Sequence, residues 1–180
     1  MISRGYLRVA MVSGVPVWVH WSVLLVLPAS FYYVDLFFAA VVASVSYVFL
    51  VLTHEFGHMA MAKWLGCRVV SIQLLVFDGR CFTVLPENEV ERALISAGGV
   101  IAQVPLFFLG VAAAIPVAGL PPSARDLLAP AVIVFTFFNL VFAVVNLWPR
   151  PPFDGYYAWR LIPALVRGDL LRVLRARWSA

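Results

Sequence analysis

Long runs of apolar residues, separated by short polar stretches, dominate the chain. The runs cover residues 16–34, 36–65, 93–117 and 127–148. A helix needs about 20 mostly apolar residues to cross a bilayer, so each run is long enough to do so. The pattern therefore predicts about four transmembrane helices, the second of which extends beyond the bilayer core.

Two stretches between these runs interrupt the helical pattern. Residues 69–85 hold two β-rich segments around Asp78-Gly79, a turn sequence typical of hairpins. Further along, Pro149, Pro151 and Pro152 exclude a regular helix. We expect a β-hairpin in the first stretch and, in the second, an unwound loop that re-enters the membrane.

In the C-terminal part of the chain, the apolar runs are shorter and charged residues are more frequent. After a further apolar helix expected over residues 156–166, residues 169–178 alternate leucines and valine with arginines. Such a basic amphipathic helix binds at a membrane surface. Together these elements predict an all-α polytopic membrane protein with a small hairpin, a re-entrant loop and an interfacial tail, in a single domain over residues 1–180.

The composition supports a membrane protein. Hydrophobic residues make up 63% of the chain and charged residues only 12%, and the mean hydropathy is +0.96. Soluble domains carry about 25% charged residues, which excludes an ordinary soluble enzyme. The net charge of +4 comes from basic residues that flank the apolar runs. No basic stripe interleaved with aromatic residues is present, so nucleic-acid binding is excluded as well.

The basic residues also predict an orientation. With a cytoplasmic N-terminus and four spans, Arg125 is the single basic residue on the outer side and the other twelve lie inside. Because cytoplasmic loops carry an excess of Lys and Arg, this predicts that both termini, the hairpin and the Pro-rich loop face the cytoplasm. Lys63 is the only lysine among the basic residues, which favours a GC-rich prokaryote and a prokaryotic cell membrane.

The motif His54-Glu55-Phe56-Gly57-His58 lies within the second apolar run. On a helix, HExxH places two imidazoles one turn apart, where His54 and His58 can bind one zinc ion. Glu55 is then placed as the base that takes a proton from the attacking water. Three polar side chains at this depth are costly in lipid, which indicates a functional site.

A catalytic zinc site keeps three protein ligands and one open position, so one ligand is missing from this motif. Asp35 lies at the wrong end of the first run. His20 lies near the start of that run, where a structural hydrogen bond or an interfacial position suits it better. Asp154 lies on the same predicted side as the motif, in the unwound loop. We therefore predict Asp154 as the third metal ligand.

Other polar and small residues in the runs have simpler interpretations. Cys67 and Cys81 have no CxxC spacing, so we interpret them as partly buried thiols and not as zinc ligands. Asn139 is interpreted as a hydrogen bonder between helices. Gly98 and Gly99 are interpreted as residues that let two helices approach closely.

A resemblance to a known family covers nearly the whole chain. The HExxH motif in an apolar helix and the downstream segment Asn146-Leu147-Trp148-Pro149-Arg150-Pro151-Pro152-Phe153-Asp154-Gly155 resemble the site-2 protease family of intramembrane zinc metalloproteases. The resemblance implies that Asp154 is the third zinc ligand and that Asn146 binds substrate near the metal. One departure is the sequence Ala97-Gly98-Gly99, with Gln103 nearby, where the family often has AGP followed by Asn. It leaves the polar role of this span open.

Motif and resemblance together predict an intramembrane zinc endopeptidase with one Zn²⁺ per chain. Its expected partners are the lipid bilayer and transmembrane proteins, which it hydrolyses within or near their membrane segments, as in regulated intramembrane proteolysis. Monomer and homo-oligomer are both compatible with the sequence. The alternative is a non-catalytic membrane protein whose structural zinc site binds transmembrane helices. Glu55 counts against it, because a structural site has no use for a base. A zinc transporter would need further intramembrane ligands, which the runs lack.

Overall fold

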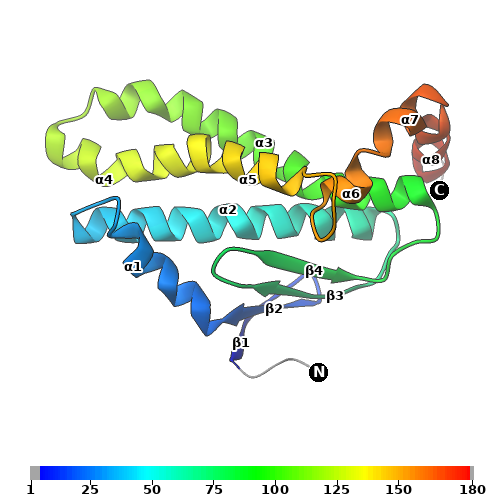
Figure 1. Cartoon of the computed structure of the whole chain (residues 1–180), viewed down its shortest axis with the longest axis horizontal. Helices are drawn as coiled ribbons and strands as arrows, with labels where there is room; N and C mark the ends of the chain where they lie inside the picture. The colour runs from blue at the N-terminus through cyan, green and yellow to red at the C-terminus, as the bar shows by residue number, and fades with distance from the viewer. Residues whose placement is uncertain (1–4, 179–180) are drawn as a thin grey trace.

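Three helices dominate the computed structural model, which describes residues 5–178 except for the side chains of 177 and 178. Within this part of the chain, three helices are long and apolar enough to cross a membrane. They are α2 (Phe37–Trp64), α3 (Glu89–Ala118) and a continuous helix Pro122–Asn146 composed of α4 (Pro122–Ile133), the π-helical turn η2 (Val134–Phe138) and α5 (Asn139–Asn146). They lie side by side along the long axis of the molecule (Figure 1).

The second, third and fourth apolar runs thus form helices, as predicted, with shifted ends. Helix α3 begins before its apolar run because the side chain of Asn88 accepts the backbone N–H groups of Val90 and Glu91. The segment between the third and fourth apolar runs, residues 118–126, already contains the first turn of α4. Pro122 suits that turn because its missing N–H would have no partner there.

A four-stranded sheet lies beside these helices. Its strands, in spatial order, are β1 (Tyr6–Val12), β2 (Val15–His20), β3 (Val69–Leu74) and β4 (Gly79–Thr83). The β1–β2 and β3–β4 pairs are antiparallel, and β2 pairs with β3 in parallel. The predicted hairpin over residues 69–85 is confirmed as β3 and β4. It belongs to a larger mixed sheet, which the all-α fold class did not include.

The prediction of a transmembrane helix over residues 16–34 is wrong. This run begins in β2, and its helical part, Trp21–Ser30, comprises the 3₁₀ helix η1 (Trp21–Leu25) and α1 (Val26–Ser30). Ten helical residues extend about 15 Å, half the hydrocarbon thickness of a bilayer. The cause is a turn at Ser13 and Gly14, both with positive φ, which pairs the start of the run with the basic lead as a hairpin.

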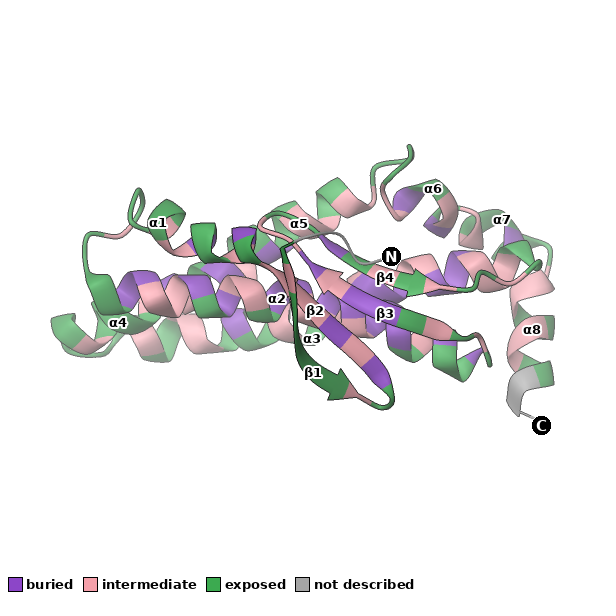
Figure 2. Ribbon diagram, turned by 90° about the horizontal axis from the view of Figure 1, so that it is seen from below, coloured by how far each residue is buried: buried purple, intermediate pink, exposed green. Residues whose placement is uncertain are grey.

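The sheet packs one face against the C-terminal half of α2. The buried residues of this core come from β2, β3 and α2, and are Val15, Val17, Val51, Met59, Ile72 and Leu74. Figure 2 shows this gradient, with buried positions along β2 and β3 and an exposed β1 at one edge of the sheet. Strand β4 forms the other edge. The sheet is therefore held along the half of α2 that contains the HExxH motif.

Short helices close one end of the bundle. The helix expected over residues 156–166 is split into α6 (Gly155–Ala158) and α7 (Leu161–Val166), and the predicted tail helix is confirmed as α8 (Asp169–Trp178). Helix α8 lies across the end of α3 (Figure 1). Its Leu170 and Val173 pack on a core made by the ends of α2 and α3. Its binding to a membrane surface stays a prediction.

Candidate metal site

Helix α2 brings three polar side chains to one buried position. The exposed fractions of His54, Glu55 and His58 are 2%, 3% and 7%. One helical turn separates the two imidazoles, and their Nε2 atoms lie 3.0 Å apart. One ligand atom from each of the three residues lies within 4.8 Å of the others. The motif therefore forms a compact donor cluster.

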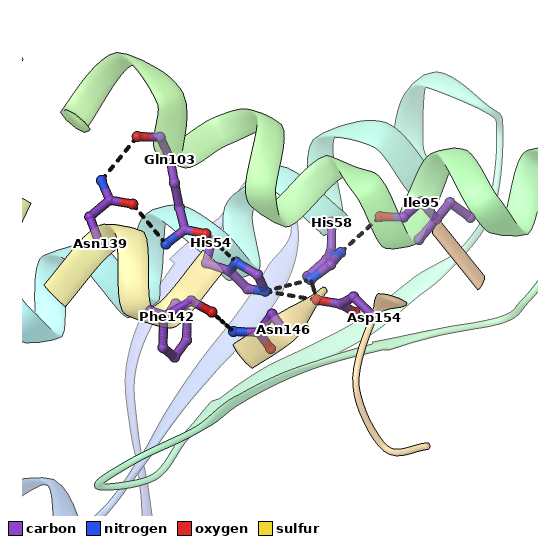
Figure 3. Close-up of polar contacts among 8 residues, drawn as sticks. All are labelled: His54, His58, Ile95, Gln103, Asn139, Phe142, Asn146 and Asp154. Carbon is purple, nitrogen blue, oxygen red and sulfur yellow. Dashed lines mark hydrogen bonds and ion pairs between the residues drawn. The ribbon is translucent and has the colours of Figure 1, made fainter. Parts of the chain in front are cut away.

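The loop over residues 147–154 returns the chain from the end of α5 to this cluster. Asp154 Oδ2 lies 3.0 Å from His54 Nε2 and 3.1 Å from His58 Nε2 (Figure 3). The fold-back depends on Gly155, where a Cβ atom would lie 2.1 Å from the backbone oxygen of Leu147. Trp159 Nε1 donates to the same oxygen at 2.7 Å. The lack of a side chain at Gly155 and the hydrogen bond from Trp159 thus allow the chain to fold back with Asp154 beside the imidazoles.

The geometry and chemistry of these donors fit a zinc ion. Two imidazole nitrogens and one carboxylate oxygen lie 3.0–3.1 Å from one another. Such atoms repel unless a proton or a metal cation lies among them. Around a tetrahedral zinc ion with bonds of about 2.0 Å, neighbouring ligand atoms are about 3.3 Å apart. The three donors are close to that spacing, so His54, His58 and Asp154 would hold the ion.

Each imidazole has a hydrogen-bond partner on its other nitrogen. His58 Nδ1 lies 2.8 Å from the backbone oxygen of Ile95, and His54 Nδ1 lies 2.9 Å from Gln103 Oε1. Since a carbonyl only accepts, His58 Nδ1 carries the ring proton and Nε2 of the neutral ring keeps its lone pair. The ring of Phe142 packs edge-on against that of His54, with centroids 5.1 Å apart. The rings therefore have little freedom to turn.

Glycines on α2 and α3 permit this arrangement. A Cβ atom at Gly57 would lie 2.2 Å from the backbone oxygen of Gly98, so the two helices touch through their backbones. One residue further, a Cβ atom at Gly99 would lie 2.5 Å from His58 Nε2 and 2.6 Å from His54 Nε2. The interpretation of Gly98 as a packing residue agrees with this contact. Gly99 has a second effect, because it leaves space at the donor atoms.

Two groups near the cluster have shifted pKa values. Burial raises the pKa of Asp154, but the facing imidazoles of His54 and His58 lower it by more, to about 2, so Asp154 is a carboxylate at neutral pH. Burial, and the nearby Glu55 and Asp154, raise the pKa of the Cys81 thiol to about 11. Without a bound metal ion, Cys81 is therefore a protonated thiol at neutral pH, and its intermediate burial agrees with its interpretation as a partly buried thiol.

The cluster opens on a cavity of 1320 Å³. Its walls are α1, α2, the part of α3 at Ile95 and Ser96, the β3–β4 hairpin, the helix Pro122–Asn146, the loop before α6 and α6 itself. Strand β4 approaches Glu55 closely, because a Cβ atom at Gly79 would lie 2.4 Å from Glu55 Oε1. Apolar side chains from the helices make up most of the lining elsewhere. A largely apolar chamber therefore leads to buried polar donors.

The remaining predicted residues lie further from the donors. Asn146 lines the cavity, and its Nδ2 donates to the backbone oxygen of Phe142 at 2.9 Å. His20 lies outside the cluster, where its Nδ1 accepts the N–H of Ser22 at 3.3 Å and caps η1. Gln103 is not among the site residues that the sequence predicts. A buried amide within an apolar helix was the available signal, because such a group needs a partner.

Comparison with known proteins adds an independent line of support. No family model matches the chain. A segment of 106 residues, 59% of this chain, is 34% identical to Stage IV sporulation protein FB of Bacillus subtilis (strain 168). The chain spans about a third of that relative, since the match covers 35% of its length.

In structure, the chain is similar to the site-2 protease from Methanocaldococcus jannaschii. The TM-score is 0.59 and the sequence identity 21%, over 88% of this chain and 72% of the other. These similarities confirm the resemblance to the site-2 protease family. The structural likeness concerns the fold, and the His54-Glu55-His58 cluster is compatible with zinc binding within it.

Proposed function

We propose that the chain is an intramembrane zinc endopeptidase that hydrolyses peptide bonds within or near transmembrane segments of other proteins. The observation that supports this most is the set of three donor atoms 3.0–3.1 Å apart, with Glu55 beside them, on the wall of a largely apolar cavity. Two of these donors, His54 and His58, lie with Glu55 on α2, which is long enough to cross a membrane. The similarity to Stage IV sporulation protein FB and to a site-2 protease supports the same class.

The proposed ligands are His54, His58 and Asp154. A bound zinc ion would polarise the scissile carbonyl and lower the pKa of a water molecule towards 7. Glu55 would accept the proton of the attacking water and pass it to the leaving amine. Because only 3% of Glu55 is exposed, bulk water has little access to that proton transfer.

The substrate must be extended before it can be cut, because the amides of a transmembrane helix are bonded within the helix. Strand β4 is an edge of the sheet and lines the cavity beside Glu55. An extended segment can add to such an edge through its backbone. Asn146, on the opposite wall, would bind the substrate backbone. We also propose a prokaryotic cell membrane. The prediction that both termini are cytoplasmic assumed four spans, and three spanning helices would place the two ends of the described chain on opposite sides.

The proposal is tested with purified protein in lipid vesicles and tagged polypeptides that each contain one apolar span. Zinc content and cleavage are measured for the wild type, Glu55→Gln and Asp154→Asn. We expect one zinc per wild-type chain, and an unchanged zinc content in Glu55→Gln with cleavage lowered by at least about a hundredfold. Asp154→Asn should lose both zinc and cleavage. Undiminished cleavage by Glu55→Gln would reject the mechanism, and zinc binding without cleavage of any span would favour a structural metal site.

A further inference from the structure

Two buried amides lie on the Nδ1 side of His54, away from the three donor atoms. Gln103 on α3 and Asn139 on α5 have exposed fractions of 1% and 2%, and neither lines the cavity. Burying an amide is unfavourable unless its polar atoms are hydrogen-bonded. Here the two amides bond to each other, and Gln103 also bonds to His54 (Figure 3). They can therefore influence the site only through His54.

The direction of every hydrogen bond in this group follows from one backbone carbonyl. The backbone oxygen of Gln103 can only accept, so Asn139 Nδ2 donates to it at 3.1 Å. Asn139 Oδ1 then faces Gln103 and accepts from Gln103 Nε2 at 3.2 Å. The remaining atom of that amide, Oε1, faces His54 Nδ1 at 2.9 Å and must accept its proton.

A neutral imidazole has one ring proton, so a proton on Nδ1 leaves a lone pair on Nε2. We propose that Gln103, oriented by Asn139, is a positioning residue that holds His54 with Nε2 ready to bind the metal ion. This inference rests on the zinc site of the proposed function. His58 has an equivalent acceptor, the backbone oxygen of Ile95, for the proton on its own Nδ1. Partners of this kind fix the tautomer and the ring orientation of metal-binding histidines.

The path of the third long helix places Asn139 next to α3. The π-helical turn η2 directly precedes Asn139, and a π turn changes the phase of the helix that follows. Helix α3 meets this turn at Gly110, where a Cβ atom would lie 2.9 Å from the Cβ atom of Phe135. Thr136 Oγ1, in this turn, donates to the backbone oxygen of Val132 at the end of α4 at 2.7 Å. The close contact of the two helices thus continues up to the amide pair.

The test measures zinc affinity of the purified full chain in detergent, by competition with a chelator and without any substrate. Gln103→Met, which removes the acceptor at similar volume, should weaken zinc binding about 10- to 100-fold. Gln103→Glu keeps an acceptor for His54 Nδ1 and should restore most of the affinity. The double variant Gln103→Met/Asn139→Leu should bind zinc as Gln103→Met does, because the two residues act in series.

Ser44→Ala is the matched control, since Ser44 Oγ lies 3.0 Å from Ser30 Oγ on α1 and donates to the backbone oxygen of Ala40, away from the metal donors. It should bind zinc like the wild type. Wild-type affinity in Gln103→Met would overturn the inference. If Gln103→Met does not fold, Gln103→Glu decides the test. Zinc affinity of Gln103→Glu as low as that of an unfolded sample would also overturn the inference. If the wild type binds zinc but cleaves nothing, the proposed function is rejected. The zinc affinities of the Gln103 and Asn139 variants would then still support the positioning role.

Discussion

On the α2–α3 side of the candidate metal site the chain is closely packed, whereas the side formed by β4, α5 and the loop over residues 147–154 leaves a cavity of 1320 Å³. On the packed side, backbone touches backbone at Gly57 and Gly98, and both histidines have partners for Nδ1. On the open side, Asp154 reaches the donors with a side chain that is 22% exposed.

This difference separates two tasks. A metal ion needs donors held in one geometry, and backbone contacts and buried hydrogen bonds supply that rigidity. A polypeptide substrate needs space and an accessible strand edge, which a closely packed wall would not offer. We therefore expect changes on the α2–α3 side to alter zinc binding, and changes on the β4 side to alter cleavage with zinc retained.

The largest effect is expected for Gly99→Ala, on the packed side. The new methyl group would lie 2.5 Å from His58 Nε2 and 2.6 Å from His54 Nε2, in the space that the donors face. Zinc affinity should fall by at least about a hundredfold, and cleavage should fall with it. Competition with a chelator measures the first and the tagged-span assay the second.

Gly119→Ala is the matched control for Gly99→Ala. The substitution is the same and lies at the end of the same helix, but the nearest atom to its Cβ is 3.6 Å away. It should bind zinc like the wild type. If Gly99→Ala also did so, the space beside the two Nε2 atoms would not be needed for the metal.

The second prediction concerns Gly79→Ala, on the open side. Its methyl group would lie 2.4 Å from Glu55 Oε1, so the carboxylate must move while the three proposed ligands keep their positions. A displacement of about 1 Å at a catalytic group can lower the rate about a hundredfold. We expect that loss in cleavage, with zinc affinity unchanged. A loss of zinc, or cleavage at the wild-type rate, would contradict the separation of the two sides.

The sequence predicts the features that depend on local patterns, on both sides of the site. The HExxH spacing places His54 and His58 on one helical face by local geometry alone, and α2 extends over nearly the residues predicted for it. Residues 69–85 form the expected hairpin because Asp78-Gly79 is a local turn signal. Such local patterns predict structure well because the contacts they imply are made between residues that are close together in the sequence.

What was missed depends on contacts between distant segments. The strand β2 is as apolar as a membrane helix, and only its pairing with β1 and β3 distinguishes the two. Gln103 and Asn139 are 36 residues apart, and their contact depends on how α3 crosses the helix that contains η2. Neither a π turn nor a helix crossing has a pattern that is visible in one sequence.

A smaller effect is expected for the ion pair that joins α3 to the segment after Asp154. Arg160 Nη1 lies 2.5 Å from Glu89 Oε1, and its guanidinium lies over the rings of Tyr156 and Tyr157. Because both partners are more than a third exposed, the pair is worth no more than about 1 kcal/mol. Arg160→Gln should therefore weaken zinc binding by less than about fivefold. Glu89→Gln should have the same effect, and a hundredfold loss in either variant would show that this contact holds Asp154 in place.

The smallest effect is expected for Cys81, which faces the cavity without taking part in the proposed site. Burial raises the pKa of its thiol to about 11, and the nearby acidic groups add to the shift. Only the thiolate reacts with iodoacetamide, so at pH 8 the thiolate fraction is about a hundredfold lower than for a thiol of ordinary pKa. In a Cys67→Ser background, the alkylation rate of Cys81 should rise with pH until about pH 11.

The matched measurement is zinc binding by Cys81→Ser, which should equal that of the wild type because a protonated thiol contributes no ligand. Alkylation that reaches its plateau near pH 9 would show a thiolate in the cavity at lower pH than expected. Protection of Cys81 from alkylation by zinc, together with weaker zinc binding by Cys81→Ser, would show that Cys81 is a further ligand. Because Cys81 lies on the open side, this result would contradict the separation of the two sides.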